Sequence, residues 1–475
     1  MNGIRLRTKI EVMFVLFFLL MLAIVSVTSL TRTISDTSDS IETFIRNSKG
    51  NIWEPTGSNI QSALYSLNST GGTVFLPVGT IYINAPILTV NNTKLVGAGY
   101  STVLKISSSF SNSFGIIKAG VARKQNNITI SDMTLDGNNT HAIMQFQTAK
   151  FITLQNLNIK NCLGNAIYFY GNSTNNLITN IRIYHTTSYQ GIALDWVHDT
   201  IVSNIIISNS TGAGAFGIAA NYGKNVTFDN IHIDNTSYGM KVIGISPYVS
   251  SNININNVFI DNVHTSDDIF KIFLANYVNI NNLNINQSRG NGFVIGMCNY
   301  VNANNIYING STIYGIKVSD SKYVNINNGM TRKTTSSGVA LDNCDSCTIT
   351  NLQTMQAGVY NLISSSEDIT IASSNFLSGA SYGLDFADCS NFKVIGCNFL
   401  NNIGDGITTE VTSCNNFIIM GCYFKGNDKA MDIHASDNYF IISSCIADSG
   451  DSVDVNAALS STRRVNDTIC SLVVS

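Results

Sequence analysis

Two adjacent carboxylates, Asp267 and Asp268, precede an apolar strand-like segment, and lysines recur around them at one phase of a repeat. The lysines are Lys241, Lys271 and Lys317, and the alternation of their neighbours places all three on an outward face. Carboxylates beside a row of cations fit the cleavage of a chain of acidic sugars, because one Asp acts as acid or base while lysines hold the sugar carboxylates. The alternative is a set of solvated turns with surface ion pairs of little energetic worth.

Further side chains at the same surface are expected to contact the substrate. Arg289 and Asn291 occupy the turn of the next repeat. Tyr168 and Tyr170 should point outward near Asp195, and aromatic faces stack on the apolar faces of sugars. The predicted substrate-binding residues are Lys241, Lys271, Arg289, Asn291, Tyr168, Tyr170 and Asp195.

A second group of acidic residues lies toward the C-terminus and forms an alternative site. Its predicted members are Asp385, Glu410, Asp432 and Asp454, with His434 beside them. Asp432 and Asp454 fall in adjacent repeats, near the separation of a retaining pair, and Asp385 and Asp432 lie two repeats apart, near an inverting one. The same oxygens suit Ca²⁺, so calcium is the one cofactor to consider, and polar lining of a groove is the other interpretation.

These residues are positioned by a repeat that runs from about Ile128 to Val465 with a period of roughly 20 to 27 residues. Each unit holds short runs of alternating apolar and polar residues separated by Asn, Gly and Ser, which is typical of strands and turns. A unit of this length cannot bury its apolar face alone. Stacked units can, so the sequence predicts an all-β solenoid of about 14 coils.

Two regularities support the stacking of coils. One is an Asn at a single phase, expected to stack as a column at a sharp turn: Asn156, Asn180, Asn204, Asn230, Asn257, Asn282, Asn305 and Asn328. The other is a set of inward positions read from the alternation: Ile192, Leu194, Met240, Val242, Phe293, Ile295, Ile316, Val318, Leu384, Phe386, Met431 and Ile433.

Composition narrows the class of partner. The net charge is −3, and charged residues make up 12% of the chain, which gives no reason to expect nucleic acid. The ten cysteines follow the phase of the repeat, so most are interpreted as inward ladders of buried thiols, although Cys389 and Cys414 would be close enough to form a disulfide.

The N-terminus has the pattern of a targeting segment. Basic residues precede an apolar run over residues 12–30, which suits a secretory signal or a membrane anchor. We therefore expect a signal or anchor at 1–30, a polar linker at 31–56, a cap and first coils at 57–127, the solenoid at 128–465 and a C-terminal cap strand at 466–475. The protein is then secreted or held at the cell surface, with the membrane as a partner through residues 12–30.

The segment between the linker and the repeats supplies a resemblance. Ser58 is predicted to cap a short helix that runs to about Leu67 and covers the open end of the stack. The following GGTVFLPVGTI, LVGAG and TVLKI resemble the opening of the pectate-lyase-like superfamily of right-handed parallel β-helices. The resemblance implies a single-stranded right-handed parallel β-helix and a connection to polysaccharides, but no single reaction.

Part of the first site also resembles the motif set of polygalacturonases. Asp267 and Asp268 match the DD pair and Lys317 matches the Lys of RIK, so the resemblance implies that these three are catalytic. Tyr238 stands where that family has its first catalytic Asp, Asn291 replaces the His and Gly315 replaces the Arg. Two classes of function remain: an enzyme that hydrolyses, eliminates or epimerises an acidic polysaccharide, and a non-catalytic surface rod, adhesin or envelope protein that binds glycan.

Overall fold

The computed structural model describes residues 43–110, 115–119, 125–212, 214–409, 414–434, 437–448 and 450–455. The segment predicted as a signal or anchor, the C-terminal cap strand and Cys470 lie outside the described residues. Within the described part, no helix has both the length and the apolar composition needed to cross a bilayer.

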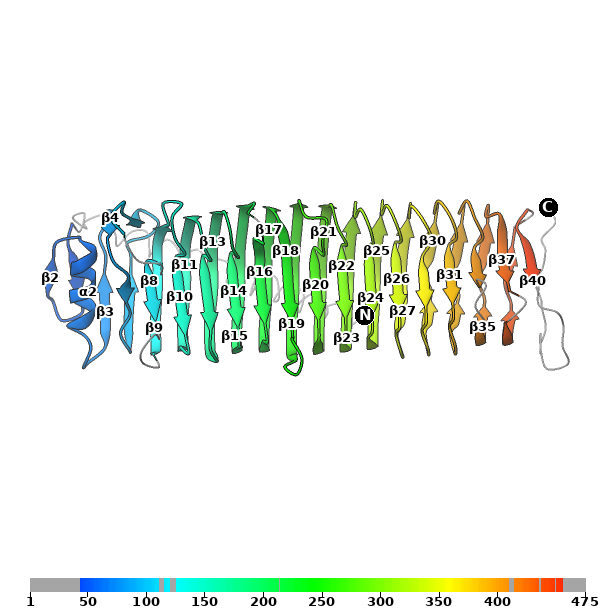
Figure 1. Ribbon diagram of the computed structural model, residues 1–475, viewed down its shortest axis with the longest axis horizontal. Helices are drawn as coiled ribbons and strands as arrows, with labels where there is room; N and C mark the ends of the chain where they lie inside the picture. The colour runs from blue at the N-terminus through cyan, green and yellow to red at the C-terminus, as the bar shows by residue number, and fades with distance from the viewer. Residues whose placement is uncertain are drawn as a thin grey trace, which may run out of the picture. The chain divides into compact units, whose positions relative to one another are not determined.

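Two parallel sheets form the solenoid, and their strands run across the direction in which the coils stack (Figure 1). Sheet B is a single column of short strands, one per coil: β5 (Ile87–Leu88), β8 (Ile117–Ala119), β10 (Met144–Gln147), β12 (Ile167–Tyr170), β14 (Ile192–Asp195), β16 (Phe216–Asn221), β18 (Tyr238–Ile243), β20 (Phe270–Phe273), β22 (Phe293–Gly296), β24 (Ile316–Ser319), β26 (Val339–Asp342), β28 (Leu362–Ser364), β31 (Leu384–Ala387), β34 (Ile407–Thr409), β37 (Lys429–Ile433) and β40 (Ser452–Val455). The sequence prediction of a stacked all-β coil is therefore confirmed. Sheet B has 16 strands rather than about 14, because β5 and β8 precede the region where the repeat is legible.

Sheet A carries the rest of each coil on 24 strands. They are β1 (Ile45–Asn47), β2 (Ile52–Trp53), β3 (Gly72–Phe75), β4 (Gly79–Ile83), β6 (Thr93–Val96), β7 (Thr102–Ile106), β9 (Asn126–Asp136), β11 (Lys150–Cys162), β13 (Ser173–Thr186), β15 (Val197–Ser210), β17 (Lys224–Thr236), β19 (Ser250–Val263), β21 (Ala275–Ser288), β23 (Asn299–Asn309), β25 (Lys322–Arg332), β27 (Thr348–Met355), β29 (Thr370–Ala372), β30 (Asn375–Leu377), β32 (Lys393–Ile395), β33 (Asn398–Leu400), β35 (Asn415–Met420), β36 (Tyr423–Lys425), β38 (Asn438–Ser443) and β39 (Ile446–Ala447). Beyond β27 each long strand divides into two, since β27 pairs with both β29 and β30.

The predicted Asn column forms the bend in the long strands of sheet A. All eight residues have φ between 53° and 59°, the left-handed conformation that Asn tolerates better than most residues. Their amides bond along the stack: Nδ2 of Asn282 donates to Oδ1 of Asn257 at 2.9 Å, and Nδ2 of Asn305 donates to Oδ1 of Asn282 at 2.9 Å. The column therefore turns these strands, and amide bonds within it, together with bonds from Asn156 to Asp132 and from Asn257 to Asp229, satisfy many of its polar atoms.

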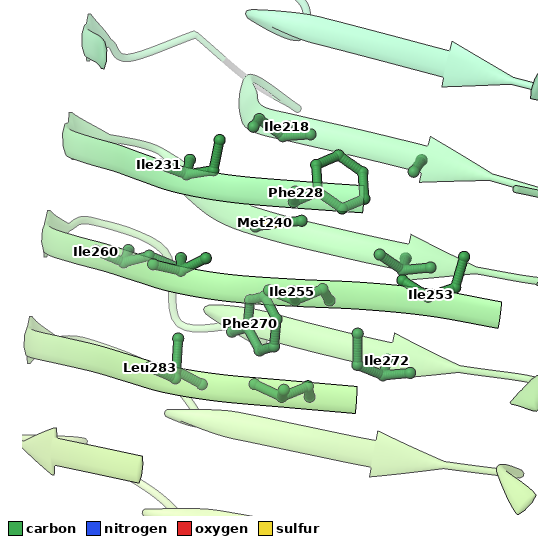
Figure 2. Packing of buried hydrophobic residues seen from close by; sticks show 14 of the residues in the cluster. Ile218, Phe228, Ile231, Met240, Ile253, Ile255, Ile260, Phe270, Ile272 and Leu283 are labelled. Atoms are coloured by element: carbon green, nitrogen blue, oxygen red, sulfur yellow. The ribbon is translucent and has the colours of Figure 1, made fainter. Parts of the chain in front are cut away.

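The core lies between the two sheets and continues from coil to coil. Figure 2 shows Met240, Phe270 and Ile272 of sheet B lying together with Ile255 and Ile260 of sheet A. Every inward position read from the alternation is buried. All nine cysteines within the described residues are buried free thiols, and none of them forms a disulfide with another.

The N-terminal end differs from the expectation in two respects. The helix is α2 (Gly57–Tyr65), and its N-cap is Thr56, not Ser58, because the Thr56 hydroxyl accepts from the backbone N–H of Asn59 at 3.3 Å. The expected linker is also partly structured: β1 and β2 pair antiparallel, and β1 pairs antiparallel with β3. Figure 1 shows α2 against the first coils, where its buried face covers the end of the core.

Candidate functional site

Seven of the fifteen predicted site residues occupy one register column of sheet B. Register pairing runs from β12 to β40 with one irregularity, between Lys429 and Met431, so corresponding residues of neighbouring strands lie about 4.8 Å apart. This outer column contains Tyr168, Ala193, Ala219, Lys241, Lys271, Val294, Lys317, Ala340, Leu362, Asp385, Thr408 and Asp432, and the backbone of Asp454 pairs with that of Asp432. Along the stack it changes from aromatic to cationic to acidic.

A cleft of about 560 Å³, here called the first cleft, opens beside the aromatic end of this column. Its floor comes from the last residues of four successive strands, Tyr170, Asp195, Asn221 and Ile243. Tyr168 and Lys241 also line it. The two column positions between them are Ala193 and Ala219, both buried, so no bulky outward side chain separates the phenol from the amine.

Asp195 is held from two sides inside the first cleft. The Tyr168 hydroxyl donates to Oδ2 of Asp195 at 2.9 Å, and Nδ2 of Asn221 donates to Oδ1 at 2.6 Å. Burial raises the pKa of Tyr168, and its hydrogen bond to the carboxylate raises that pKa further. The phenol thus keeps its proton at neutral pH, and the carboxylate is fixed in one orientation.

Lys241 lines the same cleft, and its surroundings shift the pKa of its amine. Its Nζ lies 4.2 Å from the centroid of the Phe216 ring, a cation–π contact. Burial lowers the pKa of Lys241 below the ordinary value, and nearby Lys271 lowers it too, whereas Asp195 and Asp267 act in the opposite sense. A lysine in such surroundings releases its proton more readily than an exposed one, which suits it to proton transfer.

The far rim of the first cleft is aromatic, and only part of it was foreseen. Trp196 and Tyr222 stack with ring centroids 4.2 Å apart, and both have left-handed backbones, with φ of 59° and 58°. Tyr248 meets Trp196 edge to face at 4.6 Å. Tyr248 belongs to a small hairpin after β18, in which Ile245 and Tyr248 exchange backbone hydrogen bonds of 2.8 and 2.7 Å. The signal available in the sequence was Pro247, one of only four prolines, which interrupts the repeat there.

The predicted pair Asp267 and Asp268 is divided between two environments. Asp268 is 9% exposed; its Oδ2 lies 2.8 Å from Nζ of Lys271, and its Oδ1 accepts from Nδ2 of Asn291 at 2.7 Å. Asp267 is exposed, and its Oδ1 accepts from the backbone N–H of Asp268 at 2.9 Å. Asp268 therefore acts on Lys271 and fixes its position beside Lys241.

The other members of this group lie farther along the stack or outside the column. Lys317 is two strands beyond Lys271, with Val294 between them, and its Nζ lies 5.3 Å from the Tyr314 ring. Arg289 is exposed in the turn before β22. Neither residue lines the first cleft. The catalytic role implied for Asp267, Asp268 and Lys317 stays a prediction.

The two carboxylates of the acidic group whose side chains are described are buried or bonded to a lysine, whereas a paired-carboxylate site needs two accessible carboxyl groups. Asp385 is only 1% exposed, and Asp432 bonds Nζ of Lys429 at 2.7 Å. Burial, together with Asp432 and Asp428, raises the pKa of Asp405 to about 6, although Lys429 opposes the shift. Glu410 and the side chain of Asp454 lie outside the described part of the chain, and His434 follows β37.

The acidic group does not form a set of ligands for calcium among the described residues. Among the described residues, no group of three or more His, Cys, Asp or Glu side chains is close enough to hold a metal ion. The expectation of calcium stays a prediction.

Comparisons with known proteins agree with this architecture. A family profile described as "Rhamnogalacturonase A/epimerase, pectate lyase-like" matches residues 47–259. The tailspike protein of Escherichia coli bacteriophage HK620, solved with a hexasaccharide, superposes with a TM-score of 0.51 at 12% identity, over 84% of this chain and 76% of that one. The chain fits the pectate-lyase-like group of right-handed parallel β-helices.

A curated relative extends the comparison at the level of sequence. The chain is 26% identical over 209 residues to mannuronan C5-epimerase AlgE1 of Azotobacter vinelandii, a match covering 38% of this chain and 14% of that protein. The A-module of mannuronan C-5 epimerase AlgE6 from the same organism gives a TM-score of 0.44 at 16% identity, over 82% of this chain and 94% of that one. The chain thus spans only a small part of its curated relative.

Proposed function

We propose that the protein binds an acidic polysaccharide in the first cleft and moves a proton on the carbon next to a uronate carboxylate, giving elimination or epimerisation. One observation carries the proposal: Lys241 and Lys271 are register neighbours, and Lys241 lines the same cleft as the hydrogen-bonded pair Tyr168 and Asp195.

Lys271 and Lys241 have different roles in the proposed reaction. Lys271, fixed by Asp268, holds the sugar carboxylate with its remaining ammonium hydrogens. Lys241, whose pKa burial lowers, takes the proton from the adjacent carbon once its amine is neutral. The electron pair of the broken C–H bond passes into the carboxylate, where the charge of Lys271 stabilises it.

The intermediate has two outcomes with balanced products. If the glycosidic oxygen at the neighbouring carbon leaves, that oxygen takes a proton and an unsaturated uronate forms. If a proton returns to the opposite face, the configuration is inverted and the chain stays intact. Tyr168, protonated at neutral pH and lining the same cleft, gives its proton to the leaving oxygen in the elimination. In the epimerisation it delivers that proton to the face of the sugar opposite Lys241.

Hydrolysis fits the first cleft less well. A glycosidase needs two carboxyl groups that flank the bond. Among the described residues that line this cleft, Asp195 is the only carboxylate, and both of its oxygens already accept hydrogen bonds. The likeness to a mannuronan C5-epimerase also supports a uronate polymer as the substrate class.

A second candidate function is non-catalytic binding of glycan at the cell surface or outside the cell. Asp268 favours it, because this carboxylate, expected to act as acid or base, is already bonded to both Lys271 and Asn291. Asp268 and Lys271 then offer a bound glycan a charged contact, but Asp268 is not free to act as acid or base.

The test compares turnover and binding on the full chain. Purified protein is incubated with mannuronan, alginate and polygalacturonate, with absorbance reporting unsaturated uronate and proton NMR reporting inverted sugars. Lys241→Ala should lower turnover about 100-fold or more, whereas Lys393→Ala, at an exposed lysine of β32 in sheet A, should leave it within about threefold. Binding without any product would favour the second candidate, and no binding to any of the three polymers would contradict both.

A further inference from the structure

A second cleft of about 500 Å³ lies at the opposite end of the sheet B strands. Its residues come from the turns that precede β10, β12 and β14 and from the start of β10. Those with exposed apolar surface are Leu163, at 43% exposure, and Tyr189, at 56%. His141 and Met144 also line it. No Asp, Glu, Lys or Arg is among its described lining residues, in contrast to the first cleft.

Tyr168 is the residue common to both clefts. It is the second residue of β12, and its ring stacks on Tyr170, the last residue of that strand, with centroids 4.7 Å apart. The first cleft contains the C-terminal ends of strands, and the second contains the turns before their N-terminal ends. A line from one to the other therefore follows the strands and crosses the stacking direction.

We infer that the second cleft is a sugar-binding site for the same polysaccharide, which crosses the outer face of sheet B along the strands. The inference rests on the proposed function of the first cleft. Lys271 holds one uronate by its charge beside Lys241, and Leu163 and Tyr189 hold a residue farther along the same chain by its apolar face. The shared wall at Tyr168 makes the two sites continuous.

The chemistry of the second cleft selects this occupant. A pyranose has a face of C–H groups that packs on aromatic and aliphatic side chains, so it needs no charge from the protein. Gln145, next to Tyr168 in the outer column, supplies an amide for sugar hydroxyls. The competing path runs along the stack through Lys271 toward Lys317, but it passes Val294, a buried position without a polar group.

The two paths make opposite predictions for oligosaccharides of increasing length. Calorimetry on the full chain would measure the Kd of uronate oligomers from disaccharide to hexasaccharide. On the inferred path, Tyr189→Ala weakens the hexasaccharide about three- to tenfold and leaves the disaccharide unchanged, because one ring contact contributes on that scale. Lys317→Ala should change neither. Tyr189 is exposed in a turn, so the variant is expected to fold, and circular dichroism checks that it does.

Three other outcomes of the calorimetry would contradict the inference, and each has a different pattern of Kd values. If Lys317→Ala weakens the hexasaccharide and Tyr189→Ala does not, the polysaccharide follows the stack. If the wild-type affinity does not rise with length, the second cleft binds no sugar, although the first still can. If no uronate oligomer binds the wild type, the proposed function itself fails, and this inference with it. Lys241→Ala, which should weaken every length, separates these cases.

Discussion

The Tyr168 hydroxyl donates to the Asp195 carboxylate on the next strand of sheet B, at 2.9 Å, and Asn221 on the strand after that donates to the same carboxylate. Three successive coils thus contribute to one polar chain along the first cleft. Each donor or acceptor is held by a strand whose register is fixed by its neighbours. A site on such a frame needs little reorganisation when a sugar enters, which favours both affinity and proton transfer.

The pH dependence of turnover should report the Lys241 amine. As a base, Lys241 must be neutral, so kcat/KM should rise with pH through a pKa that burial places below the ordinary lysine value of 10.5. In Asp195→Asn this limb should move to lower pH, because Asp195 is one of the charges that favour the ammonium. Initial rates across the alkaline range measure both. A limb that is unchanged in Lys241→Arg would contradict the assignment.

Asp405 should make the protein less stable at neutral pH than a neutral residue would. Its pKa, about 6 when folded against 3.8 ordinarily, means that the folded state favours the protonated carboxyl. The resulting stability is complete below about pH 4 and is lost as the pH rises through about 6. Asp405→Asn should therefore raise the free energy of unfolding at pH 7 by about 1 kcal/mol after solvent screening, and change it little at pH 4. Urea unfolding at both pH values is the measurement; equal effects would mean that the carboxyl is not shifted.

The Asn column should separate backbone strain from hydrogen bonding. Asn282 has φ of 59° and bonds to Asn257 and Asn305. Asn282→Ala and Asn282→Gly both remove these bonds, but only Gly adopts a positive φ without cost. The Ala variant should thus be less stable than the Gly variant by about 1 kcal/mol. Chemical denaturation of the pair tests this, and equal stability would show that the bend relaxes.

The phenylalanine ladder of the C-terminal coils should dominate their stability. Phe399 is fully buried and stacks between Phe376 at 5.1 Å and Phe424 at 5.0 Å. Phe399→Ala should cost about 3 to 5 kcal/mol, because it leaves a cavity that a closed stack cannot fill. Phe399→Leu retains most of the volume and should cost clearly less. Since solenoid stability is local, hydrogen exchange over residues 376–424 should show the loss first.

The architecture was predictable from sequence because a solenoid is specified locally. The alternation of apolar and polar residues around Met240 or Phe386 predicts which side of a strand faces the core. The spacing of Asn257 and Asn282 predicts where each of these coils turns. The alternation repeats along the whole stack and the Asn in a run of successive units, so the phase of one coil fixes the phase of the next. Hence Lys241, Lys271 and Lys317 were placed correctly in one column.

The site was less predictable, because alternation does not state what covers an outward residue. Asp268 and Asp385 were both expected to face solvent, yet both are nearly buried. The aromatic rim depends on positive φ at Trp196 and Tyr222 and on a hairpin that belongs to one coil only. Such irregular features have no counterpart in neighbouring repeats, so no comparison within the sequence exposes them.

The hairpin that carries Tyr248 leaves the ladder on either side of it undisturbed: Ile243 still pairs with Phe273, and Ser250 pairs with Ala275. A loop that leaves the sheet and returns to it without shifting the strand register can be replaced by another loop. Its length and chemistry are free to vary while the lysines and the carboxylate beneath keep their places. Selection, or a designer grafting a foreign loop between residues 244 and 249, can therefore change the aromatic rim of the first cleft without rebuilding the scaffold.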